Sequence, residues 1–269
     1  ADHHRAKTRS GRAQLMSRKI LHLSDLHFGR SDDDLEAPLL AAIAELAPDL
    51  VAISGDFTQR ARIGQFTRAA QFLAQIKAPI LPVPGNHDIS LDNLYLRLLR
   101  PFGRYKRFIR PDLEPVYEDE AMVVAGLNSV DRFAWQRGKL SPRRLAKLCR
   151  AFEGRADKLC VAVLHHPLEQ GPQVEKRLAR GARAALAQLA SCGTDLVLSG
   201  HLHDWRAAPV VGAGDPRLLQ LQVGSTLSDR VPEGENDFAL LDLDGDRVAI
   251  TRMAAGPGPR FRPARSWQF

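Results

Sequence analysis

Seven residues of the kinds that bind divalent cations lie in five short polar blocks of the chain. They are two aspartates, one asparagine and four histidines: Asp25, His27, Asp56, Asn86, His165, His201 and His203. Their oxygen and nitrogen atoms suit hard or borderline ions such as manganese, iron, zinc and cobalt. These blocks contain no cysteine, which argues against a structural thiolate zinc site.

This set of ligands is too large for one ion. Seven ligands fill two coordination spheres when one aspartate is shared, so the sequence predicts a pair of divalent metal ions. We expect manganese and iron first, with zinc or cobalt as alternatives. Ions about 3.5–4 Å apart are a standard means of hydrolysing phosphate esters, because together they stabilise the attacking and the leaving oxygen. The residue types therefore predict phosphoester hydrolysis.

Each polar block follows a short apolar run that predicts a β-strand, at residues 18–24, 50–54, 80–83, 159–165 and 195–199. Patterns typical of amphipathic helices lie between and after these runs, at residues 35–46, 63–76, 91–99, 142–152 and 177–191. This alternation predicts a largely parallel sheet covered by helices. Ligand-binding crevices in such sheets form at the carboxyl ends of the strands. We therefore expect the five blocks to meet at one edge.

The remaining apolar runs predict further strands at residues 122–127, 210–211, 218–223, 238–243 and 248–253. Asp244-Gly245-Asp246 predicts a tight hairpin turn between the last two. Consecutive strands after an alternating first half indicate two sheets packed together, with helices outside.

The five blocks also match, in order, the motifs of a known family. Asp25-Leu26-His27, Gly55-Asp56, Gly85-Asn86-His87-Asp88, His165 and Gly200-His201-Leu202-His203 span about two-thirds of the chain. The chain thus resembles the calcineurin-like metallophosphoesterases, whose pattern is DxH, GD, GNH[DE], H and GHxH. The resemblance implies an α/β fold, a four-layer α-β-β-α sandwich of two mixed sheets flanked by helices.

The resemblance also implies a role for each motif residue. Asp25, His27 and His203 would bind the first metal, Asn86, His165 and His201 the second, and Asp56 would bridge the two. Hydroxide held between the metals would attack phosphorus. His87 would protonate the leaving oxygen, and Asp88 would orient His87 and fix its tautomer.

Three further residues are weaker candidates for substrate contacts. Asn128 ends a predicted strand, His166 follows a predicted ligand, and Arg132 lies in the next loop. For His166, packing beneath the site is an equal alternative.

The sequences of three motifs, SDLHFG, GNHD and GHLH, together with the short chain, resemble most those of the class III cyclic-nucleotide phosphodiesterases. The resemblance implies a small phosphorylated substrate, a phosphodiester such as cyclic AMP. One alternative is a pyrophosphatase acting on a nucleotide-sugar lipid precursor of the UDP-diacylglucosamine type, and another is a metal-dependent nuclease. Outside enzymes, the chain could be a nucleic-acid or membrane-binding module with a vestigial site.

Composition divides the chain into three parts. We expect a basic N-terminal extension at residues 1–17, one metallophosphoesterase domain at 18–253, and a Gly/Pro/Arg-rich surface tail at 254–269. Basic and aromatic residues alternate at 95–110, within a possible cap insertion at 95–115. This segment predicts either a cap over the site or, as the favoured alternative, a helix or pair of helices with buried aromatics and a solvated basic face.

The net charge of +7 favours anionic partners. Nucleic acid and anionic membrane surfaces are therefore alternatives, although less favoured than a nucleotide-like small molecule. No apolar run approaches the roughly 20 residues of a membrane span.

The chain contains three cysteines without CxxC spacing, which argues against a disulfide framework. The lack of such a framework predicts a reducing, cytoplasmic location, with Cys160 as a buried thiol. The oligomeric state stays open.

Overall fold

The computed structural model describes residues 17–269 except 211–217, 230–234, 246, 257 and 259. The predicted N-terminal extension, residues 1–17, therefore lies outside the described residues apart from Ser17. Among the described helices, none is long and apolar enough to cross a membrane.

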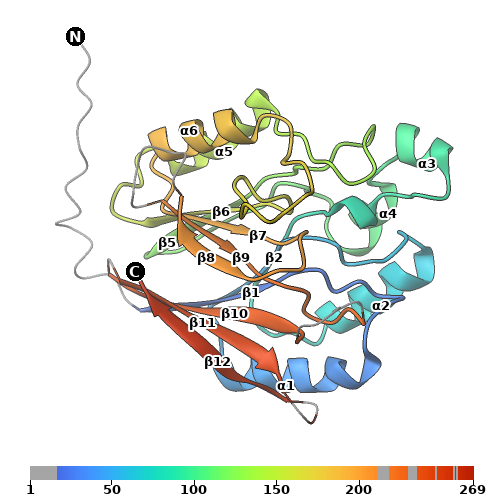
Figure 1. Ribbon diagram of the computed structural model, residues 1–269, viewed down its shortest axis with the longest axis horizontal. Coiled ribbons are helices and arrows are strands. Elements are labelled where there is room, and N and C mark those ends of the chain that lie inside the picture. The colour runs from blue at the N-terminus through green and yellow to red at the C-terminus, as the bar shows by residue number, and fades with distance from the viewer. Residues whose placement is uncertain (1–16, 211–217, 230–234, 246, 257, 259) are drawn as a thin grey trace.

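Two β-sheets pack face to face in the described part of the chain (Figure 1). The first contains β1 Arg18–Leu23, β2 Leu50–Ile53, β3 Ile80–Pro82, β10 Asp237–Asp244, β11 Arg247–Ala255 and β12 Phe261–Gln268. The second contains β4 Val116–Glu118, β5 Met122–Gly126, β6 Leu159–Val163, β7 Leu196–Ser199, β8 Arg206–Pro209 and β9 Leu219–Gln222. Their strand orders are β12-β11-β10-β1-β2-β3 and β4-β5-β6-β7-β9-β8.

Helices cover the outer faces of both sheets. Helices α1 (Glu36–Leu46) and α2 (Ile63–Leu73) pack on the first sheet, and α5 (Pro142–Phe152) and α6 (Ala182–Ser191) pack on the second. A third cluster of apolar side chains fills the space between the sheets. The four-layer α-β-β-α sandwich expected from the resemblance is confirmed.

The central strands are parallel within each sheet. Strands β1, β2 and β3 pair in parallel, as do β5, β6, β7 and β9. Every residue of β2, β6 and β7 is buried, because such strands have covered faces on both sides. This double burial explains why the sequence shows continuous apolar runs here instead of alternation. The parallel direction of these strands also places their carboxyl ends at one end of the sandwich.

The end of the chain is a strand, so the prediction of a surface tail at 254–269 was wrong. Strand β12 pairs antiparallel with β11, with Trp267 opposite Ile250. Most side chains of β12 are exposed, so its sequence lacks the apolar alternation of a half-buried strand. Pro263 is tolerated because it lies beside a register shift in an edge strand, where a ladder hydrogen bond can be missing. Backbone pairing, which residue type does not reveal, forms this element.

The structure also decides the predictions for one hairpin and for short strands. The predicted hairpin is confirmed by the pairing of Asp244 with Arg247, although Asp246 lies outside the described residues. The strand predicted at 210–211 was misplaced, since β8 ends at Pro209 and residue 211 is not described. Strand β4 was not predicted. It is only three residues long and lies at a sheet edge.

The basic, aromatic segment forms two short helices, α3 (Leu94–Leu99) and α4 (Gly103–Phe108). The helix pair is therefore confirmed, but its halves differ. In α4, Tyr105 is fully buried against Phe57, as the buried-aromatic alternative required. In α3, by contrast, Leu94, Tyr95 and Leu99 are exposed, and the helix lies at the periphery on the right of Figure 1.

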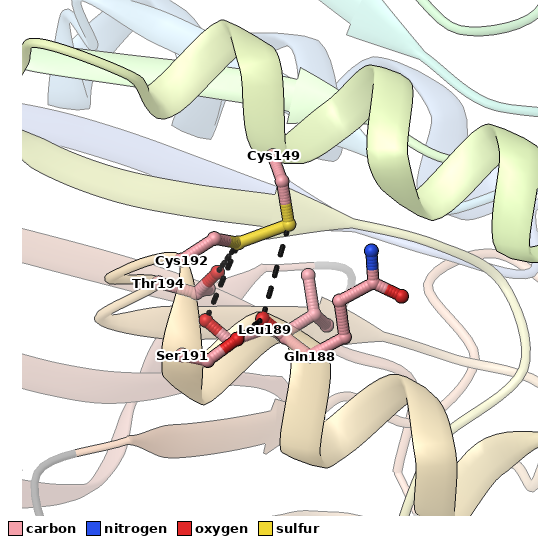
Figure 2. The surroundings of a disulfide bond; sticks show 6 residues. All are labelled: Cys149, Gln188, Leu189, Ser191, Cys192 and Thr194. Atoms are coloured by element: carbon pink, nitrogen blue, oxygen red, sulfur yellow. Dashed lines mark hydrogen bonds between the residues drawn. A yellow bond between two sulfur atoms is a disulfide. The ribbon is translucent and has the colours of Figure 1, made fainter. Parts of the chain in front are cut away.

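A disulfide joins Cys149 of α5 to Cys192, the residue that follows α6 (Figure 2). The expectation that the chain carries no disulfide was therefore wrong. The two cysteines are 43 residues apart in sequence, but their Cα atoms are 5.5 Å apart, because the two helices pack side by side on the second sheet. Cys160 is buried and takes no part in this disulfide, as predicted.

Candidate metal centre

All seven predicted ligands and His87 follow the carboxyl ends of parallel strands. Asp25 and His27 follow β1, Asp56 follows β2, and Asn86 and His87 follow β3, all in the first sheet. From the second sheet, His165 follows β6, and His201 and His203 follow β7. The structure brings these side chains together from both sheets and buries most of them.

The first group consists of Asp25, His27 and His203, whose ligand atoms lie within 4.8 Å of one another. His203 Nε2 and His27 Nε2 lie 3.1 and 3.4 Å from Asp25 Oδ1, and 3.2 Å from each other. Even so, the buried Asp25 Oδ1 makes no hydrogen bond in the described structure. Three buried ligand atoms that converge on one point, one of them without a hydrogen bond, fit a common cation.

The second group forms around His165 and Asp56. His165 Nε2 lies 3.1 Å from Asn86 Oδ1 and 3.3 Å from Asp56 Oδ2. Asp56 Oδ2 is also 3.8 Å from His27 Nε2 in the first group. The Asp56 carboxylate therefore lies between the two groups, where a bridging ligand would be.

His201 and His166 complete this side of the centre. His165, His166 and His201 are also close enough to hold an ion together. However, His166 Nδ1 lies 2.8 Å from Ser129 Oγ, and His166 Nε2 lies 2.8 Å from the Gln136 carbonyl. Because both ring nitrogens have protein partners, His166 packs beneath His201. This is the second of the two alternatives left open by the sequence.

Many of the ligands adopt a left-handed backbone conformation that side chains with a Cβ rarely take. The φ angles are 53° at Asp25, 48° at His27, 53° at Asp56, 75° at His201 and 57° at His203. Such residues cost free energy and persist only where their surroundings hold them. Here the Asp25 N–H donates to the Gly55 carbonyl at 3.0 Å, and the His27 N–H donates to the Asp56 carbonyl at 2.9 Å. The two loops hold each other in place.

Two motif glycines allow the loops to come this close. A Cβ on Gly85 would lie 2.1 Å from Asp56 Oδ1, and a Cβ on Gly200 would lie 1.9 Å from Ser24 Oγ. Neither distance is compatible with a side chain. The glycines of GNHD and GHLH are thus needed for the position of the two carboxylates, Asp56 and Asp25.

His87 is oriented by a backbone carbonyl. His87 Nδ1 lies 2.8 Å from the carbonyl oxygen of Gln59, so Nδ1 donates and Nε2 is left for other chemistry. The ring also packs edge-on against His27, with centroids 5.0 Å apart. Burial lowers the pKa of His87, and Asp56 only partly offsets this effect.

Asp88 has a different role from the one expected of it. Its carboxylate accepts hydrogen bonds from the N–H groups of Gly85, Phe57 and Thr58 at 2.9, 3.3 and 3.0 Å. Burial, followed by repulsion from Asp56, raises the pKa of Asp88 to about 7. Asp88 therefore ties the two loops together. The expectation that it orients the His87 ring was wrong, because the Gln59 carbonyl is in that position.

Buried charges in the centre stabilise one another. Burial would raise the pKa of Asp56, but His165 and His87 hold it well below its usual range. Burial would likewise lower the pKa of His165, yet Asp56 and then Asp25 outweigh burial and raise it to about 9. Two buried carboxylates thus need positive charge beside them, as two divalent ions would provide. The donor set and its geometry fit such ions.

The other two substrate candidates lie differently. Asn128 is buried, and its Oδ1 accepts the Val130 N–H at 3.0 Å, while its Nδ2 has no hydrogen-bond partner in the described structure. Arg132 is exposed and directed to Phe133 and to the Leu98 carbonyl, which its Nη1 reaches at 3.0 Å. Asn128 could still meet a ligand, whereas Arg132 is engaged with α3.

Sequence reasoning missed Gln59 and Ser129. Gln59 acts on His87 through its main chain, and every residue type has a carbonyl, so no sequence signal could have identified it. Ser129 follows Asn128 at the end of β5, and this position after a strand was the available signal.

Comparisons with known proteins agree with this arrangement. Glycerophosphodiester phosphodiesterase GpdQ of Enterobacter lignolyticus is 26% identical over 159 residues, 55% of this chain and 56% of that protein. UDP-2,3-diacylglucosamine pyrophosphatase LpxG of Chlamydia trachomatis is 34% identical over 81 residues, 29% of this chain and 25% of that protein. The matches thus span about half and a quarter of these relatives' lengths.

Solved structures share the fold at low sequence identity. Purple acid phosphatase PPD1 from yellow lupin has a TM-score of 0.67 and 12% identity, covering 95% of this chain and 54% of that one. A dimetal phosphatase from Danio rerio has a TM-score of 0.65 and 14% identity, covering 93% and 98%. The sequence model described as "Calcineurin-like phosphoesterase" matches residues 18–205, which contain all five polar blocks. The chain therefore belongs to the calcineurin-like phosphoesterase family.

Proposed function

We propose that the chain hydrolyses a phosphodiester at two divalent metal ions, with a cyclic nucleotide such as cyclic AMP as the leading substrate. The observation that carries the dinuclear proposal is the position of Asp56, whose Oδ2 lies 3.3 Å from His165 and 3.8 Å from His27. Manganese and iron are the first expectation for the ions, and zinc or cobalt the alternatives.

The ligand residues divide as the family motifs imply. Asp25, His27 and His203 would hold one ion, Asn86, His165 and His201 the other, and Asp56 both. When bound, the ions would lower the pKa of a water molecule and neutralise charge on the phosphate oxygens.

His87 would complete the reaction by moving a proton. Bond formation between a water oxygen and phosphorus expels the leaving oxygen, which needs a proton when it is a poor leaving group. Since Nδ1 donates to Gln59, Nε2 is the atom that can give this proton. A lowered pKa makes the protonated ring a stronger acid.

A second candidate is cleavage of a nucleotide-sugar lipid pyrophosphate. It is supported by the two LpxG relatives, which are 32% and 34% identical over 81 residues and are named for a diacylglucosamine substrate. GpdQ, by contrast, is named for a glycerophosphodiester and supports the phosphodiester class. A cyclic nucleotide remains an expectation from the motif wording.

The experiment is a substrate panel with manganese-loaded protein. Cyclic nucleotides, a glycerophosphodiester, bis(p-nitrophenyl) phosphate, a nucleotide-sugar lipid in detergent, nucleic acids and a phosphomonoester would be compared by kcat/KM. We expect the diesters to be cleaved fastest, and Asp56→Ala to lose at least about a thousandfold of kcat/KM. Exposed Asp92→Ala, whose carboxylate pairs with Arg60, is the matched control. Turnover by the Asp56 variant at the wild-type rate would refute the shared-carboxylate site.

The cytoplasmic location remains a separate prediction. It was based on the expected absence of disulfides, and the Cys149–Cys192 disulfide removes that argument because such bonds persist mainly in oxidising compartments. A free-thiol count on protein taken from its native compartment decides the question. Three free thiols would support the prediction, and one would contradict it.

A further inference from the structure

Six large apolar side chains are exposed on two neighbouring segments of the chain. They are 39% to 74% exposed and consist of Leu94, Tyr95, Leu98 and Leu99 on α3, with Phe133 and Trp135 in the loop at 131–137. We call these six residues the apolar edge. Elsewhere in the described part of the chain, the comparably exposed large apolar residues are Ile63, Val116 and Phe269, which are not consecutive with one another. A contiguous exposed apolar group of this kind is typical of a binding surface.

Arg97 fixes the two segments of the apolar edge to each other. Its guanidinium is buried and donates to the carbonyls of Arg132, at 2.9 Å, of Ser90, at 3.2 Å, and of Ala134. The same guanidinium packs on the Trp135 ring, 5.2 Å from its centroid. Burying a cation is costly unless it is hydrogen-bonded throughout. The two segments of the apolar edge are therefore held in a fixed relative position and are not independent loops.

Basic residues predominate beside the apolar edge, and Asp131, the acidic residue at the start of its loop, is buried. Residues 94–110 contain six basic and no acidic residues, and residues 132–139 contain three basic and no acidic residues. Arg100 follows α3 directly and is exposed, and Arg132 reaches the Leu98 carbonyl at 3.0 Å. The nearest acidic residue before α3, Asp92, pairs with Arg60 and Arg62. Anything that covers the edge must tolerate a positive rim.

We propose that the apolar edge docks on an anionic phospholipid surface. Leucines can enter the acyl region, while Tyr95 and Trp135 suit the boundary between headgroups and acyl chains. Arg100 and Arg132 would meet the phosphates of anionic lipids, which attract basic residues close to the surface. A second copy of the chain fits less well, because a symmetric dimer would place this positive rim against itself.

The apolar edge lies beside the metal centre. The Ser90 carbonyl bound by Arg97 is two residues after Asp88, and the Gln136 carbonyl, next to Trp135, holds the His166 ring. Docking would thus bring these loops of the candidate centre close to the lipid surface. The docking itself needs no metal, so it can be measured without relying on the proposed hydrolysis.

The test is co-sedimentation of the EDTA-treated full chain with sucrose-loaded vesicles. Vesicles of phosphatidylcholine alone would be compared with vesicles containing a quarter phosphatidylglycerol. We expect at least about tenfold stronger partitioning to the anionic vesicles, weakened by salt. Leu99→Glu should reduce partitioning to the anionic vesicles at least about tenfold, since a leucine side chain that would enter the lipid is lost. Val116→Glu, an exposed apolar residue on strand β4 outside the edge, should bind like the wild type.

A second measurement locates the contact. Brominated lipids should quench the tryptophan fluorescence of the wild type, and Trp135→Phe should still bind while losing that quenching, because Trp205 and Trp267 stack on each other elsewhere. Equal binding to neutral vesicles, full binding by Leu99→Glu, or quenching that survives Trp135→Phe would overturn the proposal. A dimer that Leu99→Glu dissociates, without vesicle binding, would assign the edge to self-association and likewise overturn it.

Discussion

Asp56 and His87 lie on two different loops of the candidate centre, after β2 and after β3, and a hydrogen bond joins them. Asp56 Oδ1 accepts the His87 backbone N–H at 2.8 Å, while Asp56 Oδ2 faces His165. One carboxylate thus positions the backbone of His87, the proposed proton donor, and also faces a proposed metal ligand, His165. Substitutions at these residues should therefore affect metal content and proton transfer separately.

Replacing His87 by alanine should leave two metal ions per chain and lower kcat by about 10²–10⁴-fold, most for poor leaving groups. The pH dependence has a defined sign. Because the pKa of His87 lies below its ordinary 6.5, the protonated donor should be lost as pH rises through that lower value. The measurement is kcat against pH for an alkyl and a nitrophenyl ester, with metal analysis. Loss of metal in His87→Ala would show that His87 is a ligand instead.

Replacing Gly85 by alanine should displace Asp56, since the added Cβ would lie 2.1 Å from Asp56 Oδ1. We expect a loss of about 2–4 kcal/mol in the free energy of unfolding together with a lower metal content. Gly64→Ala in α2 is the matched control, because nothing lies within 4 Å of its Cβ position. That control should be stabilised by up to about 1 kcal/mol. Urea denaturation of both variants decides, and equal stabilities would contradict the packing argument.

At the scale of elements, the left-handed residues after β1, β2 and β7 turn the chain sharply at the carboxyl ends of the strands. The loops therefore depend on the sheets for their conformation. The Cys149–Cys192 disulfide joins α5 to the end of α6 on the outer face of the second sheet (Figure 2), whereas the predicted ligands follow the carboxyl ends of strands. Stability and catalysis should thus separate there.

Removing the disulfide with Cys149→Ala and Cys192→Ala should lower the free energy of unfolding by about 2–4 kcal/mol, because the bridge closes a loop of 43 residues in the unfolded chain. The kcat should not change. Denaturation curves with and without reductant provide the test: reductant should shift the wild type to the midpoint of the double variant and leave the variant unmoved. A wild type indifferent to reductant would contradict the prediction.

The whole molecule joins two sheets through one charged centre. Each sheet supplies ligands, with Asp25, His27, Asp56 and Asn86 from the first and His165, His201 and His203 from the second. Metal binding should therefore stabilise the sandwich as a whole, and chelation should lower the melting temperature as well as abolish activity.

The metal-free protein should lose stability between about pH 6.5 and 9. The pKa of His165 is raised from 6.5 to about 9 by Asp56 and Asp25, against burial, so its contribution is complete below 6.5 and lost as pH rises through 9. The loss should be at most about 3 kcal/mol. Urea denaturation of EDTA-treated protein at both pH values tests this, with His165→Asn as the control lacking the dependence. Manganese-loaded protein should not show it, because a metal binds the neutral ring.

The main strands and the convergence of the polar blocks after them could be predicted from the sequence because their signals are local. A strand covered on both faces is largely apolar, as β2 and β6 are, and the polar residues after it then stand out. The order of the five blocks and the parallel topology together predict that the blocks converge. Residue type and spacing were sufficient for this much.

Other features depended on the fold. Strand β12 is held by backbone pairing at a sheet edge, and the Cys149–Cys192 bond depends on two helices lying side by side. The Gln59 carbonyl took the place expected of Asp88, and α3 left Leu94, Leu98 and Leu99 exposed. Each of these features involves backbone groups or segments that are distant in sequence. The relative positions of such groups are fixed only when the chain packs, so residue type does not predict them.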